Sequence, residues 1–147
     1  MNQGIRPATH ADKEDWLRLR QALWPYAPAE YLTVDMDERL ADPHYAVFLA
    51  SNPDGRQVAF LEARLRDYAE GCETSPVGYI EAWYVEELSR GQRYGRELVQ
   101  AAEEWARAKG CGEMASDTWI DNEPGIQAHF KLGYQETDRL VHFMKKL

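Results

Sequence analysis

The segment that most restricts the fold is a strand, a helix and a second strand in direct succession. Val77 to Val85 is an apolar, aromatic-rich run typical of a long strand, and Tyr94 to Lys109 repeats apolar residues at helical spacing before Gly110. Glu113 to Thr118 is a short second strand. Because such a unit places its two strands parallel with a right-handed crossover, the sequence predicts a parallel pair inside a sheet.

The rest of the chain adds antiparallel strands and further helices. Tyr45 to Ala50 and Val58 to Leu65 flank the turn signal 52–55 (Asn-Pro-Asp-Gly), which predicts a hairpin. The other predicted elements are a strand around Ile5, a helix capped by Thr9 that runs to Pro25, a helix over 29–41, a helix from about Pro124 to Leu132, and one or two closing strands over 134–145. We expect an α/β (mixed α+β) fold, with a mixed sheet and helices on both faces.

Composition limits the partners and the compartment. The 147 residues, 44% of them hydrophobic, are enough for one domain over 1–147 with its own core. The net charge of −8 disfavours nucleic acid and favours a cationic small molecule. No apolar run approaches the roughly 20 residues of a membrane span, and the first 16 residues lack the apolar core of a signal peptide. Cys72 and Cys111 lie far apart and suit reduced thiols, so we expect a cytoplasmic protein.

The turn between the long strand and its following helix carries the strongest chemical signal. Gly91 and Gly95 allow close approach to the backbone, and Arg90, Arg93 and Arg96 add positive charge to an acidic chain. A helix N-terminus presents free N–H groups that bind phosphate or pyrophosphate. The alternative from the residues alone is a helix-capping loop with solvated arginines.

This turn resembles the acyl-CoA loop of the GCN5-related N-acetyltransferase (GNAT) superfamily, through its Arg-Gly-Gln-x-x-Gly pattern after a strand. The stretch 128–134 (Ala-His-Phe-Lys-Leu-Gly-Tyr) is similar to the second motif of that superfamily. More narrowly, the chain resembles bacterial aminoglycoside 6′-N-acetyltransferases over nearly its full length. The blocks that carry this resemblance are 16–25, 62–68, 71–77, 80–85, 114–118 and 133–137.

Two positions depart from the superfamily pattern. Arg93 stands where the loop prefers glycine, and Glu87 stands where proline commonly follows the strand. If position 93 requires a positive φ, arginine there costs about 1 kcal/mol or more. The departure at 93 bears on the affinity for the cofactor.

The resemblance implies acetyl transfer from acetyl-CoA to the 6′-amine of an aminoglycoside, by direct attack in a ternary complex and without a metal. It implies that the two parallel strands part, and that a backbone N–H near Tyr84 stabilises the oxyanion. It also implies a homodimer. The predicted cofactor-binding residues are Trp83, Val85, Arg90, Gly91, Gln92, Arg93, Tyr94, Gly95, Arg96 and Asn122.

Three side chains are candidates for proton transfer. Asp117, at the end of the second parallel strand, is the first choice for binding the ammonium group and accepting its proton; its alternative role is to cap the next helix. Glu81 lies within an aromatic strand, either as a functional acid or paired with an arginine. His129 occupies the slot of the superfamily's thiolate-protonating tyrosine, or is a packed helical histidine. The four histidines share no ligand spacing, so no metal is expected.

The acceptor would be contacted by residues outside the parallel strands. Tyr68 and Glu73 fall in the loop before the long strand, Trp24 ends the first helix, and Glu136 follows the Gly133 turn. The alternatives are surface positions for Tyr68, Glu73 and Glu136, and a core position for Trp24. Two other functions stay open: acetylation of a polyamine or peptide amine, and non-catalytic binding of cationic drugs if Arg93 disables the loop.

Overall fold

The computed structural model describes residues 4–147 and contains a five-stranded sheet in the order β1-β2-β3-β4-β5. The strands β1 to β4 pair antiparallel, and β4 pairs parallel with β5. The predicted mixed sheet, its hairpin and its parallel pair are thereby confirmed. The strands are β1 (Ile5–Pro7), β2 (Tyr45–Ser51), β3 (Gln57–Arg66), β4 (Val77–Val85) and β5 (Met114–Ser116).

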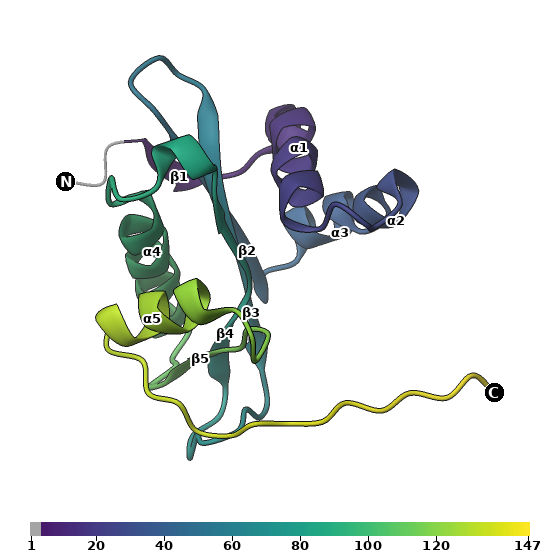
Figure 1. Cartoon of the computed structure of the whole chain (residues 1–147), viewed down its shortest axis with the longest axis vertical. Helices are drawn as coiled ribbons and strands as arrows, with labels where there is room; N and C mark the ends of the chain where they lie inside the picture. The colour runs from purple at the N-terminus through teal and green to yellow at the C-terminus, as the bar shows by residue number, and fades with distance from the viewer. Residues whose placement is uncertain (1–3) are drawn as a thin grey trace.

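Helices cover both faces of the sheet, as predicted (Figure 1). On one face α4 buries Leu98, Val99 and Ala102 against the strands, because these residues recur on one side of the helix. On the other face α1 buries Trp16 and Leu19. None of the helices within residues 4–147 is long and apolar enough to cross a membrane. The helices are η1 (His10–Asp12), α1 (Lys13–Leu23), α2 (Ala29–Thr33), α3 (Met36–Ala41), η2 (Glu87–Ser89), α4 (Tyr94–Ala108) and α5 (Glu123–Lys131).

The single helix predicted over 29–41 is wrong, because the chain forms two short helices there. α2 ends at Thr33 and α3 begins at Met36, with Asp35 between them at φ −110° and ψ 3°. The Asp35 carboxylate accepts from Arg20 at 3.0 Å and also pairs with Arg39. This pairing with α1 breaks the helix, and the local apolar pattern could not indicate it.

The closing strands predicted over 134–145 are also wrong, because the chain from Gln135 to Leu147 forms no strand within the described structure. The segment runs away from the sheet in Figure 1. Its apolar residues, among them Phe143 and Met144, are exposed. A strand requires a neighbour for its N–H and C=O groups, and this segment pairs with no strand of residues 4–147.

A buried carboxylate joins α1 to the sheet. Glu62 of β3 is 1% exposed and accepts two hydrogen bonds from Arg20, at 2.7 and 2.8 Å. It accepts further bonds from Trp16 Nε1 at 2.9 Å, Tyr45 Oη at 2.6 Å and Arg39 at 3.1 Å. Because every bond ends on one side chain, this network fixes α1, α3 and β2 relative to β3.

Candidate active site

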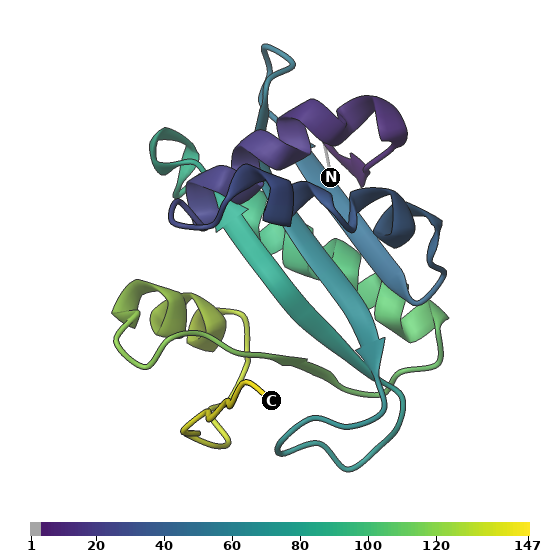
Figure 2. The same cartoon turned by 90° about the vertical axis from the view of Figure 1, so that its right-hand side faces the viewer.

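The strands β4 and β5 pair only at their start. Gly78, Tyr79 and Ile80 lie opposite Met114, Ala115 and Ser116, and no pairing follows. β4 continues to Val85, so its edge over 81–85 has no strand neighbour on the β5 side. Figure 2 shows the two strands diverging from this point. The expected parting of the parallel strands therefore occurs after Ile80 and Ser116.

Asp117 and Glu81 gather on the sheet face opposite α4. Side chains alternate along a strand, and Ile80 belongs to the core under α4, so its neighbour Tyr79 lies on the other face. The Tyr79 hydroxyl donates to Asp117 Oδ2 at 2.5 Å. Arg66 places its guanidinium 3.5 Å from the centre of the Tyr79 ring and donates twice to Glu81, at 2.9 Å each. We call Tyr79, Asp117, Glu81 and Arg66 the acceptor-face cluster.

The two predicted acids of this cluster have different partners. Glu81 is paired with Arg66 and also lies 3.5 Å from Arg64 Nε, in agreement with the alternative that it pairs with an arginine. Within residues 4–147, Asp117 accepts only from Tyr79, and burial together with Asp117 raises the pKa of that hydroxyl, which keeps it a donor. Asp117 does not cap a helix, because Asn122 caps α5 by accepting from the Gly125 amide at 3.2 Å. Asp117 is exposed and, unlike Glu81, has no cationic partner among residues 4–147.

His129 lies on the α4 side of the sheet. Its Nε2 is 2.8 Å from Ser116 Oγ, and its Nδ1 is 2.6 Å from the Gly125 carbonyl oxygen. The ring packs edge-on against Trp83 and Tyr134, with centroid distances of 5.3 and 5.8 Å. Because a carbonyl only accepts, Nδ1 carries the proton and Nε2 accepts from the Ser116 hydroxyl in the neutral ring.

The loop before α4 has the geometry of an anion site. Gly91 has φ +80°, and Arg93 has φ +76° at the N-cap of α4. Arginine thus adopts the left-handed conformation that glycine takes without strain, at about 1–2 kcal/mol. Within residues 4–147 no ion pair involves Arg93 or Arg96. Two unneutralised guanidinium groups beside the free N–H groups of a helix start suit the phosphates of coenzyme A.

Other predicted cofactor residues are already engaged within the chain. Arg90 Nε donates to the Val85 carbonyl at 2.9 Å, and its guanidinium lies 5.8 Å from the Tyr84 ring centre. Gln92 donates to the Leu88 carbonyl at 3.4 Å. Trp83 Nε1, in contrast, is buried and has no hydrogen-bond partner in the part of the chain that the structure describes. A side chain at Gly95 would approach the Trp83 ring within 3.3 Å, so glycine there permits the indole to pack on α4 near Tyr94.

The predicted acceptor contacts are not all brought together. Trp24 is half-buried against the core of the α1 face, in agreement with its core alternative. Tyr68 is exposed in the loop before β4. Glu136 is exposed and paired with Arg139, and this pairing lowers the pKa of the Glu136 carboxyl. These residues have no contact with the acceptor-face cluster among the hydrogen bonds and ion pairs of residues 4–147.

Glu113 was not singled out from the sequence, yet it anchors the loop before β4. Its carboxylate accepts from the amides of Glu73 and Thr74 at 2.8 Å each and from the Thr74 hydroxyl. These bonds lower the pKa of Glu113, the hydroxyl of Thr74 contributing most. The loop that carries Glu73 is thus tied to the start of β5.

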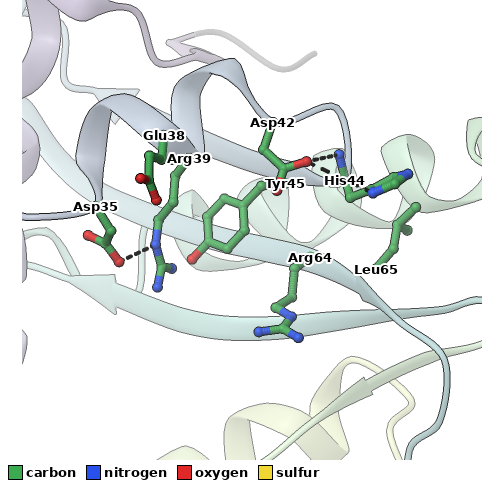
Figure 3. Close-up of a pocket in the computed structure, with 8 residues that line it drawn as sticks. All are labelled: Asp35, Glu38, Arg39, Asp42, His44, Tyr45, Arg64 and Leu65. Carbon is green, nitrogen blue, oxygen red and sulfur yellow. Dashed lines mark hydrogen bonds and ion pairs between the residues drawn. The ribbon is translucent and has the colours of Figure 1, made fainter.

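A separate pocket of about 410 Å³ lies between α3, β2 and β3 (Figure 3). It contains none of the predicted site residues, and it borders the acceptor-face cluster only through Arg64. Two of its carboxylates already have partners within the pocket. Asp35 forms an ion pair with Arg39, and Asp42 accepts a hydrogen bond from the His44 amide. No group of three or more potential metal ligands occurs in the described part of the chain. The lining residues are Asp35, Glu38, Arg39, Asp42, His44, Tyr45, Arg64 and Leu65.

Comparison with known sequences identifies full-length relatives. The acetyltransferase (GNAT) family model matches residues 16–134. An aminoglycoside N(6′)-acetyltransferase type 1 from Stenotrophomonas maltophilia is 46% identical over 146 residues, covering 97% of this chain and 93% of that protein. Its counterpart from Serratia marcescens is 44% identical over 139 residues, with 94% and 95% coverage.

Solved structures show the same fold. AAC(6′)-Iy in complex with the bisubstrate analogue CoA-S-monomethyl-acetylneamine superposes with a TM-score of 0.92 at 35% identity, covering 97% of each chain. The 6′-N-acetyltransferase AAC(6′)-IG from Acinetobacter haemolyticus superposes with a TM-score of 0.91 at 39% identity, with 97% and 98% coverage.

Proposed function

The chain belongs to the acetyltransferase (GNAT) family. We propose that it transfers acetyl from acetyl-CoA to the 6′-amine of aminoglycoside antibiotics and thereby confers resistance to them. The observation that carries the proposal is the arrangement at the parting of β4 and β5: an anion-binding loop and His129 on the α4 side, and carboxylates on the opposite side. Relatives named as aminoglycoside N(6′)-acetyltransferases, alike over nearly the whole chain, support the acceptor class.

Acetyl-CoA supplies an activated acetyl group, and the chain supplies the means to hold and polarise it. The N–H groups at the start of α4, with Arg93 and Arg96, hold the phosphates. The unpaired edge of β4 over 81–85 extends the sheet toward the amide-rich pantetheine arm. A backbone N–H near Tyr84 stabilises the negative charge that develops on the carbonyl oxygen.

The acceptor-face cluster prepares the amine. An aminoglycoside arrives as a polycation, which the net charge of −8 attracts. Asp117 binds the ammonium group and removes its proton, directly or through water, since its only partner in the described structure is the Tyr79 hydroxyl. Glu81 stays paired with Arg66 and contributes to the shape and charge of the face.

A thiol-release assay across an acceptor panel tests this function. We expect turnover with kanamycin-type aminoglycosides and little with spermidine or a lysine peptide. Turnover with spermidine alone would assign a different amine to the same chemistry. Drug binding without CoA binding, measured by calorimetry, would instead identify a non-catalytic binder whose loop Arg93 has disabled.

We further infer that residues 1–147 act as one acetyltransferase domain in a cytoplasmic homodimer. The exposed apolar residues of the segment 135–147 support pairing with a second copy of the chain, because a lone extended segment leaves them in water. The requirement for acetyl-CoA and the two free cysteines support the compartment. Light scattering on the full chain tests the dimer: truncation after Tyr134 should yield a monomer, and an unchanged mass would contradict the role of this segment.

A further inference from the structure

Of the two ring nitrogens of His129, only Nε2 faces the strands that part. Nδ1 is occupied by the Gly125 carbonyl of its own helix, at 2.6 Å. Nε2 faces the Ser116 hydroxyl at 2.8 Å. The ring packs edge-on against Trp83 and Tyr134. Among the hydrogen bonds of residues 4–147, the bond to Ser116 is the one that joins the imidazole to a strand of the sheet.

Ser116 stands at the point where the strands separate. It is the last paired residue of β5, opposite Ile80. The next residue, Asp117, bonds to Tyr79 on the opposite face. Two consecutive residues thus present a carboxylate to one face and a histidine-bound hydroxyl to the other.

We propose that Ser116 is a catalytic residue that conducts a proton from His129 to the sulfur leaving acetyl-CoA. This inference rests on the proposed function. As the amine nitrogen bonds to the acetyl carbon, the carbon–sulfur bond breaks and its electron pair stays on sulfur. The sulfur takes the Ser116 hydroxyl proton, and Ser116 Oγ takes the Nε2 proton of the imidazolium, which becomes neutral. The proton of the amine goes to Asp117, and His129 is reprotonated from solvent.

The groups around His129 fit this role. Among the titratable groups near it, Tyr134 packs against its ring with a centroid distance of 5.8 Å, and Asp117 follows Ser116 in the chain. Tyr134 donates to Glu103 of α4 at 2.7 Å, and burial with Glu103 raises the pKa of that hydroxyl, so it stays protonated. Asp117 is bonded to Tyr79 on the far face. On β4, Trp83 is not titratable and Glu81 is paired with Arg66. In the described structure, the hydrogen bond to Ser116 therefore connects His129 to the point where β4 and β5 part.

The test compares Ser116→Ala and Ser116→Thr with the control Ser51→Ala in β2. We expect Ser116→Ala to lower kcat about 100-fold with the KM for acetyl-CoA changed less than about threefold. Ser116→Thr keeps the hydroxyl and should retain most of the rate. A kcat within about threefold of that of the unmodified chain would overturn the proposal.

A measurement without turnover keeps the proposal testable if Ser116→Ala does not fold. Nitrogen NMR of His129 in the ligand-free protein should show a protonated Nδ1 and an accepting Nε2, and Ser116→Thr should preserve that pattern. A proton on Nε2 of the neutral ring would overturn the relay. The proposed function and the relay can fail independently. The proposed function fails if no aminoglycoside is acetylated. In that case the effect of Ser116→Ala on kcat is measured with whichever amine of the panel reacts.

Discussion

Replacing Glu62 with glutamine tests the network that fixes α1 to the sheet. The substitution preserves shape but removes the charge that partners Arg20, whose side chain is only 4% exposed. It also turns an acceptor of five hydrogen bonds into a group that must donate toward guanidinium nitrogens. Breaking a buried ion pair from one side destabilises a protein by about 3–5 kcal/mol. With a urea m-value of about 2 kcal/mol/M, the unfolding midpoint should fall by about 2 M.

The matched control is Glu86→Gln. Glu86 also pairs with two arginines, Arg18 and Arg56, but its side chain is 23% exposed. Solvent screens such a pair, so its loss should change the free energy of unfolding by about 1 kcal/mol or less. Urea unfolding followed by circular dichroism measures both variants. Equal midpoints for Glu62→Gln and Glu86→Gln would refute the reasoning that burial sets the importance of the Glu62 network.

Three further predictions concern the loops and the acceptor face. Asp117→Asn should lower kcat by at least about 100-fold while CoA affinity, measured by calorimetry, changes little; equal losses would remove Asp117 from the acceptor side. Arg93→Gly should raise the free energy of unfolding by up to about 1 kcal/mol, because it removes left-handed strain, and should weaken CoA binding, because it removes a guanidinium group that holds the phosphates; an unchanged CoA affinity would remove Arg93 from the phosphate site. Since the Glu113 pKa is lowered from 4.5 in the folded chain, its contribution is complete above that value and is lost as pH falls through the lowered pKa. The protection factors of the Glu73 and Thr74 amides, which correct for the intrinsic pH dependence of hydrogen exchange, should fall in that acid range, and constant protection factors would contradict the anchor.

The sequence predicted the elements whose signals are local. The strand 77–85 is confirmed at both ends, and α4 begins at Tyr94 as expected, because apolar periodicity and the glycine stop act within one element. The break between α2 and α3 depends on the ion pairs of Asp35 with Arg20 and Arg39. The absence of the closing strands depends on a missing neighbour, which alternation within the segment cannot indicate.

The sequence predicted where several residues of the candidate site lie, but not which partners they contact. The spacing of Asp117 and Ser116 around the end of β5 follows from strand alternation, so the position of Asp117 could be predicted. Arg66 pairing with Glu81 depends on the register of β3 and β4, which the residues alone do not define. Glu62 had a usable signal, because a carboxylate within an apolar strand must find a partner, and Trp16 and Arg20 lie one helical turn apart on α1.

The proposed activity requires donor and acceptor to bind on opposite faces of the sheet where β4 and β5 part. A crystal structure of the ternary complex with CoA and kanamycin tests this most directly. We expect the phosphates at the start of α4, the sulfur next to Ser116, and the 6′-amine against Asp117. Both ligands on one face of the sheet, or CoA bound away from the loop 90–96, would contradict it.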